Sequence, residues 1–166
     1  MRPTRRAAWL PLLLLLAPPA RAGESIVVFD PELRDTSGEG ERPDQQQRLG
    51  MIGALLRQGL AESGRYSLVD PAPQRARLAQ GPALGSCGAC AAEAARALGA
   101  QLALVTVVHK VSNLILYFSI TMLDAASEAE RAVWRADIRG NTDESWRHGI
   151  AWMLRHRILA EPGPGR

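Results

Sequence analysis

The sequence has 166 residues, 46% of them hydrophobic and 22% charged, which suits one globular domain with its own hydrophobic core. Its formal net charge is +3, but the first 22 residues hold four arginines and no acid. Beyond them, 16 basic and 17 acidic residues leave a net charge of −1, which argues against nucleic acid as a partner because such domains carry a basic surface.

The first 22 residues have the features of a cleaved secretory signal peptide. Arginines precede an apolar run over residues 7–17, and Ala20-Arg21-Ala22 has the small-x-small pattern of a signal-peptidase site. The run is shorter than the roughly 20 residues that span a bilayer, and no later stretch is long and apolar enough. We expect cleavage after Ala22, a periplasmic mature chain without membrane insertion, and no lipid anchor, since no cysteine follows the run.

The first part of the mature chain predicts a buried strand over residues 25–29, followed by a loop over residues 30–43 that is rich in proline and glycine. The acids of this loop lack the alternating ligand pattern of a calcium site, so we expect a solvated loop rather than a metal or cation site. These acids are Asp30, Glu32, Asp35, Glu39 and Glu41, with Asp44 beside them.

A helix is expected from Asp44, with Gln47 completing a capping box, to Gly64 at its C-terminal end. Its apolar stripe recurs at helical spacing and consists of Leu49, Ile52, Leu56 and Leu60. A short strand over residues 66–69 and a connection over residues 72–86, interrupted by proline and glycine, follow.

The second half predicts an alanine-rich helix over residues 89–98 and a fully buried strand over residues 102–108. Residues 114–123 and 132–138 alternate between apolar and polar side chains, which is typical of half-buried antiparallel strands. A second capping box over residues 141–144 starts a last helix, with the apolar stripe Trp146, Ile150, Met153, Leu154 and Ile158.

These elements predict a mixed α/β domain over residues 23–161, with a disordered tail over residues 162–166. The expected order is β-α-β-(α)-α-β-β-β-α, giving a mixed sheet of about five strands with helices packed mainly on one face. The opposite face would then be polar and either merely solvated or a surface for a partner. Its residues are Tyr117, Ser119, Thr121, Arg135 and Asp137, and Trp152 on the last helix, which lies off the apolar stripe, joins them as a candidate contact.

Cys87 and Cys90 form a C-x-x-C motif at the start of the predicted helix, and three interpretations stay open. In an oxidising compartment the pair is expected to form a structural disulfide. A redox site is the second interpretation, because a helix N-terminus stabilises a thiolate, and a metal site completed by a histidine is the third. The residue after Cys90 is alanine, which excludes attachment of a c-type haem.

No motif frames a catalytic nucleophile or a nucleotide cofactor, so we expect no catalytic residue, no cofactor and no resident metal. His109 ends an apolar strand, where a histidine is usually structural. His148 and His156 lie among arginines on the last helix and are read as its solvated face.

Several stretches resemble a family of secreted bacterial proteins of unknown function. They include Phe29-Asp30-Pro31-Glu32-Leu33, the hairpin of residues 110–116 and the segment of residues 137–146. More distantly, SGRYSLVD, ALGAQLALVTVV and LDAASEAERAVW are similar to the amino-terminal domain of TolB and to CsgG. The resemblance implies a non-catalytic envelope module that acts by protein–protein contact. Some members of the unknown-function family that it resembles are encoded near quinoprotein alcohol dehydrogenases and transporters, and the resemblance implies an accessory role beside such a system.

The leading hypothesis is therefore a periplasmic binding or assembly module that uses the polar sheet face or the acidic loop. The alternatives are a thiol–disulfide oxidoreductase using Cys87 and Cys90, and a small-ligand or metal chaperone using the cysteines and a histidine. The partner and the oligomeric state are not encoded in any motif.

Overall fold

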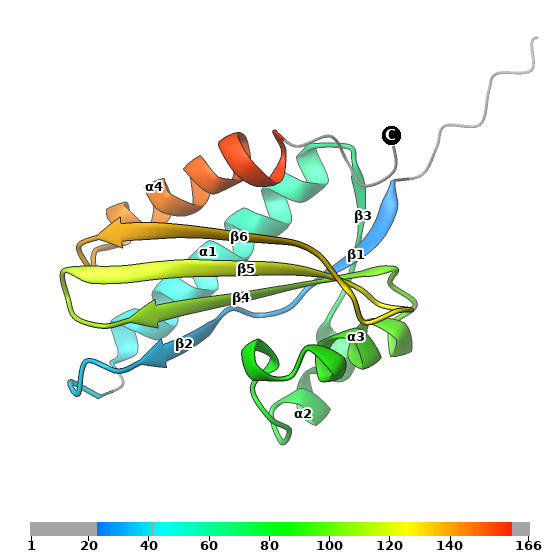
Figure 1. Cartoon of the computed structure of the whole chain (residues 1–166), viewed down its shortest axis with the longest axis horizontal. Helices are drawn as coiled ribbons and strands as arrows, with labels where there is room; N and C mark the ends of the chain where they lie inside the picture. Colours follow the sequence, from blue (N-terminus) through cyan, green and yellow to red (C-terminus); the bar gives the residue numbers. More distant parts are fainter. Residues whose placement is uncertain (1–22, 41, 161–166) are drawn as a thin grey trace, which may run out of the picture.

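Six strands form one mixed sheet in the order β3-β1-β4-β5-β6, with β2 pairing with β4 beyond the end of β1 (Figure 1). The computed structural model describes residues 23–40 and 42–160, so the expected signal peptide and tail lie outside the described residues. The strands are β1 (Glu24–Val28), β2 (Glu32–Asp35), β3 (Tyr66–Val69), β4 (Leu102–Lys110), β5 (Ile115–Asp124) and β6 (Glu130–Arg139). The pairings among β1, β2, β3 and β4 are parallel, whereas β4, β5 and β6 form an antiparallel meander.

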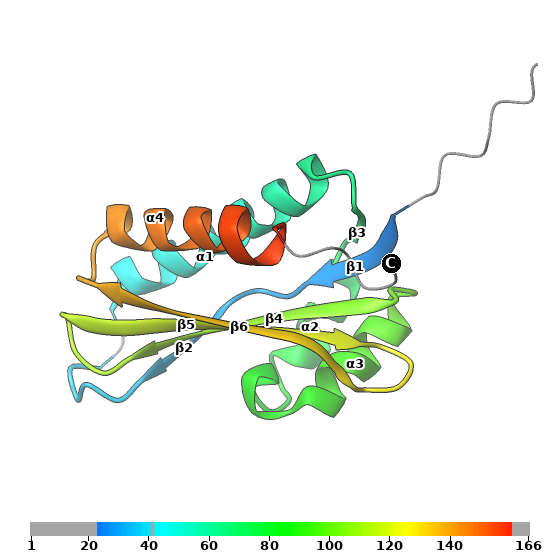
Figure 2. The same cartoon turned by 45° about the horizontal axis from the view of Figure 1, so that its top comes forward.

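Two long helices lie side by side over one face of the sheet (Figure 2). They are α1 (Pro43–Glu62) and α4 (Asp143–Met153), and α4 continues into the π-helical turn η3 (Leu154–Ile158). Both predicted apolar stripes are buried against β1, β4, β5 and β6. Gly149 lets α4 lie close to the sheet, because a Cβ there would be 2.9 Å from Phe118 Cε2. Figure 2 shows that these helices leave the opposite face of the sheet to other elements.

Short helical segments cover only one end of that opposite face. They are η1 (Ala72–Gln74), α2 (Arg75–Leu78), η2 (Leu84–Ser86) and α3 (Gly88–Ala97). Alanines of α3 pack closely against Val27, Phe29, Ala103 and Val105, which forms a second, smaller core. The mixed α/β class is confirmed, and the element order is as expected except for the additional strand β2, with two long helices on one face and short ones on the other.

The expected number of about five strands is corrected to six, because β2 lies within the segment expected to be a loop.

Both helix starts were predicted at the wrong residue. Pro43 occupies the first turn of α1, so the cap is Arg42, whose backbone N–H donates to Gln45 Oε1 at 3.2 Å. The cap of α4 is Thr142, paired with Ser145 rather than Asn141 with Glu144, because the Asn141 amide is bound elsewhere.

No helix among the described residues has the length and apolar character needed to cross a membrane.

Candidate functional site

The register of β2, β4, β5 and β6 aligns polar side chains in rows across the face that the long helices leave free. One row runs from Arg34 through His109 and Tyr117 to Asp137. In the next row Ser119 lies between Val107 and Arg135, and Thr121 follows beside Val105. The five residues expected on the polar sheet face therefore share it, and we keep that name for this surface.

The polar sheet face is hollowed into a pocket of about 330 Å³ where η2 and the start of α3 stand over it. Arg34 and Arg135 line the pocket and are exposed, and neither forms an ion pair with another residue of the described chain. The other polar lining residues are His109, Tyr117, Ser119, Thr121 and Glu130. Four of the predicted site residues are thus brought into one concave surface.

His109 is held on this surface through both of its ring nitrogens. Thr36 Oγ1 lies 2.9 Å from Nε2 and donates to the carbonyl oxygen of Lys110 at 3.2 Å. Because that hydroxyl hydrogen is used, Nε2 donates to Thr36, and Nδ1 accepts from the Tyr117 hydroxyl. A histidine bound in this way positions the tyrosine hydroxyl, and both of its ring nitrogens have partners within the described chain.

The wall of the pocket depends on an acid that was expected to be solvated. Glu32 accepts from the backbone N–H groups of Leu84 at 2.6 Å and Gly85 at 2.8 Å, which fixes η2 over the sheet. Gly85 is required by this approach, since a Cβ would lie 2.2 Å from Val107 Cγ2. A contact between residues 52 positions apart thus shapes the pocket.

Cys87 and Cys90 form a disulfide at the start of α3, with their Cα atoms 5.2 Å apart. Both cysteines are half-buried, and Cys90 packs against the second core. Gly85 and Gly88, which lie on either side of Cys87 in the sequence, line the pocket. The bond therefore fixes the backbone of the pocket wall.

We predict that this disulfide is structural, with a reduction potential below about −300 mV in a glutathione redox titration. A potential between about −200 and −120 mV would instead support the thiol–disulfide oxidoreductase. Since the bond closes a very short loop, changing both cysteines to serine is expected to lower the free energy of unfolding by at most about 2 kcal/mol.

Asp137 and Trp152 contribute to a second, larger hollow of about 600 Å³ between β6 and α4. We call it the β6 groove, and Arg135 lines both it and the pocket. Trp152 is 43% exposed, as expected from its place off the apolar stripe. Its ring stacks with His156 and with the guanidinium of Arg157, at 5.5 and 5.6 Å respectively. The pocket and the groove form one continuous surface through Arg135.

Acids of the loop that was expected to be solvated form ion pairs, although Asp30 and Glu39 keep 57% and 40% of their side chains exposed. Lys110 is fully buried, and its ammonium group donates to Asp35 at 3.2 Å, Ser37 at 3.1 Å and Glu39 at 2.8 Å. Asp30 pairs with Arg57 and Arg75, and Asp44 pairs with Arg42 and Arg48. Asp35 and Glu39 thus hold the segment of residues 35–39 to Lys110 of β4, and Asp30 joins the end of β1 to α1, whereas Glu41 lies outside the described residues.

The charges of this buried cluster stabilise one another. Burial alone would lower the pKa of Lys110, but the hydrogen bonds to Glu39 and Asp35 raise it above its usual value. The hydroxyl and the backbone N–H of Ser37, and then the Lys110 ammonium, hold the pKa of Asp35 at about 2 against the opposing effect of burial. Lys110 likewise lowers the pKa of Glu39. All three groups are therefore charged around neutral pH.

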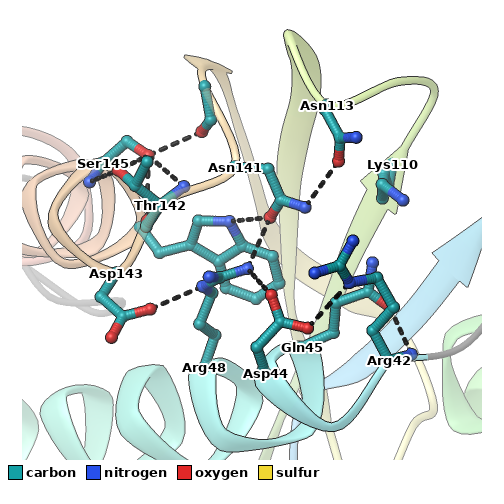
Figure 3. Close-up of polar contacts among 12 residues, drawn as sticks. Arg42, Asp44, Gln45, Arg48, Lys110, Asn113, Asn141, Thr142, Asp143 and Ser145 are labelled. Atoms are coloured by element: carbon teal, nitrogen blue, oxygen red, sulfur yellow. Dashed lines mark hydrogen bonds and ion pairs between the residues drawn. The ribbon is translucent and has the colours of Figure 1, made fainter.

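A relay of amides extends this cluster to the start of α4, and Figure 3 shows its part from Asn113 through Asn141 to Arg48. Both carboxylate oxygens of Glu39 accept from Asn113 Nδ2 at 2.8 Å. The Asn113 side-chain oxygen therefore faces Asn141, whose Nδ2 donates to it at 3.0 Å. The Asn141 oxygen then accepts from Trp146 Nε1 and from Arg48 Nη1, each at 3.1 Å. Arg48 also pairs with Asp143 at 2.7 Å. The relay joins α1, the β4–β5 hairpin and α4 behind the polar sheet face.

The sequence profile of a family described as "Protein of unknown function (DUF2380)" matches residues 24–158. The chain belongs to this family. The expected membership of an uncharacterised family is confirmed, and the match includes the hairpin and the segment before α4. Comparison with curated proteins gives no significant match.

Solved structures of low identity share the fold. The LpoB C-terminal domain from Salmonella enterica is 18% identical, with a TM-score of 0.53 over 75% of this chain and 89% of that chain. Lipoprotein GNA1162 from Neisseria meningitidis is 17% identical, with a TM-score of 0.54 over 82% of this chain and 94% of that chain. LpoB from Escherichia coli is 15% identical, with a TM-score of 0.53 and coverage of 83% and 80%. The more distant likeness to TolB and CsgG stays a prediction.

No three His, Cys, Asp or Glu side chains gather as metal ligands within residues 23–40 and 42–160.

The burial of Lys110 was not predicted from the sequence, although one signal pointed to it. Lys110 is the only lysine of the chain, beside 19 arginines. A compact ammonium with three donors fits three convergent oxygens where a planar guanidinium does not.

Proposed function

We propose that this chain is a non-catalytic module of the periplasm that binds a protein partner through the polar sheet face and the β6 groove. The observation that carries the proposal is the pair of exposed arginines, Arg34 and Arg135, which line a concave surface without an ion-pair partner in the described chain. Most other charges are neutralised internally, so this surface keeps unpaired donors for a partner.

One further feature supports binding rather than thiol chemistry. Cys87 and Cys90 are joined in a disulfide. The shared fold with a lipoprotein and with LpoB supports work in the cell envelope. A role beside a periplasmic dehydrogenase or a transport system is the finer proposal, which rests on the family resemblance.

We expect a photo-crosslinking amino acid at Ser119 to capture one periplasmic protein in the source bacterium. Ser119 lies on the floor of the pocket, and the matched control is the same crosslinker at Ala54, an exposed position of α1. Irradiation followed by mass spectrometry of the adducts measures the result. Equal adducts at both positions, or none at Ser119, would argue against the polar sheet face as a binding surface.

A further inference from the structure

We propose that the β6 groove takes an extended acidic segment of the partner protein, which joins the sheet as an additional strand beside β6. This inference rests on the proposed function and names the kind of partner. The strand β6 has ten residues and, within the described residues, pairs only with β5. Its outer edge therefore offers backbone donors and acceptors to another strand.

The groove has the geometry in which extended peptides are bound in other domains, namely an edge strand facing a helix. One wall is residues 135–139 of β6, and the other consists of Ser145, His148, Gly149 and Trp152 of α4 with Arg157 of η3. Five strand residues are about 16 Å long, enough to fix the register of a short peptide. The exposed ring of Trp152 gives an apolar surface against which one side chain of the peptide packs.

The charge of the groove selects an acidic segment. Arg135, Arg139 and Arg157 line it against one acid, Asp137. Neither Arg135 nor Arg139 forms an ion pair with another residue of the described chain. Carboxylates of a bound strand would pair with these guanidinium groups, which favours fast and specific association.

In the register centred on Asp137, a second copy of the chain fits this edge poorly. Antiparallel pairing of two β6 strands about Asp137 would place Arg135 of one copy opposite Arg139 of the other, and like charges directly opposite are destabilising. A partner segment that carries acids is therefore the occupant that the groove favours.

The test pans a phage library of random decapeptides against the oxidised, purified chain and synthesises the enriched peptides. We expect extended peptides that carry acids, and in ¹⁵N NMR titrations they should shift the amides of residues 135–139 and slow their hydrogen exchange. Arg139→Glu with Arg157→Glu should weaken binding about tenfold, because two attractions become repulsions. The matched control, Arg147→Glu with Arg155→Glu, makes the same total charge change at exposed positions outside the groove and should not alter binding.

No enrichment, enrichment without acids, peptide shifts confined to residues outside the groove, or equal loss in both variants would overturn strand addition. Those outcomes leave the crosslink at Ser119 intact if the proposed function is right. Loss of that crosslink alone would instead contradict the proposed binding of a protein partner on the polar sheet face.

Discussion

Replacing Lys110 by methionine is expected to lower the free energy of unfolding by about 3 kcal/mol at pH 7. The substitution keeps the apolar stem but leaves the Asp35 carboxylate, whose side chain is only 10% exposed, without its cation. Glu39 is more exposed and regains water, which keeps the cost at the lower end for a broken buried pair. Urea unfolding followed by far-UV circular dichroism measures the difference.

Lys110→Arg tests whether charge alone suffices. It keeps the positive charge, yet we expect a loss of at least about 1 kcal/mol, because the larger planar group cannot direct its donors at Asp35, Ser37 and Glu39 together. The control Arg155→Lys, on an exposed position, should change stability by less than about 0.5 kcal/mol. Unfolding midpoints of both Lys110 variants equal to that of the wild type would contradict the buried cluster.

The carboxylates of the same cluster make the free energy of unfolding depend on pH. The pKa of Asp35 is about 2 and that of Glu39 is also lowered in the folded state, so the unfolded chain binds more protons below about pH 4. The cluster's contribution is present above that pH and is lost as pH falls toward about 2. The gap between wild type and Lys110→Met should therefore be constant from about pH 5 to about pH 9 and shrink between about pH 4 and pH 2.

Asn141→Ala is expected to cost about 2 kcal/mol, because it removes the acceptor of a buried indole. Trp146 is fully buried and its Nε1 donates to the Asn141 oxygen, so the N–H group would be left unpaired. Arg48 would lose the same acceptor but keep its bonds to Asp44 and Asp143. Urea unfolding again gives the value, with Trp fluorescence as a second probe.

Asn113→Ala is the matched control for this prediction, since it makes the same change at the exposed end of the relay. Water replaces the amide there, so the expected loss is less than about 1 kcal/mol. A cost for Asn113→Ala equal to that for Asn141→Ala would show that the indole contact is not the decisive one.

The periodicity of the sequence predicted most of the sheet and its two faces. Alternation along residues 114–123 and 132–138 placed Tyr117, Ser119 and Arg135 on one face, because side chains of a strand alternate strictly. The helical stripes of α1 and α4 were predicted in the same way. These signals are local, and every residue of the element contributes to them.

The missed features depend on contacts between distant segments. β2 has a single apolar residue, Leu33, and its extended form is fixed by the ladder with β4. The pocket wall requires Glu32 to reach η2, and the buried cluster requires the segment of residues 35–39 to meet Lys110 at the end of β4. No periodicity records such pairings, although the lone lysine among arginines marked one of them.

The burial of that lysine has a practical consequence for finding the partner. Amine-reactive reagents label exposed lysine side chains, and the folded chain offers none, since its only lysine is fully buried. Survey experiments with such reagents would give no crosslink through a lysine side chain of this folded protein, even in an intact complex. Crosslinkers that react with carboxyl groups, or photoactivated groups attached on the polar sheet face, do not need an exposed lysine and can report these contacts.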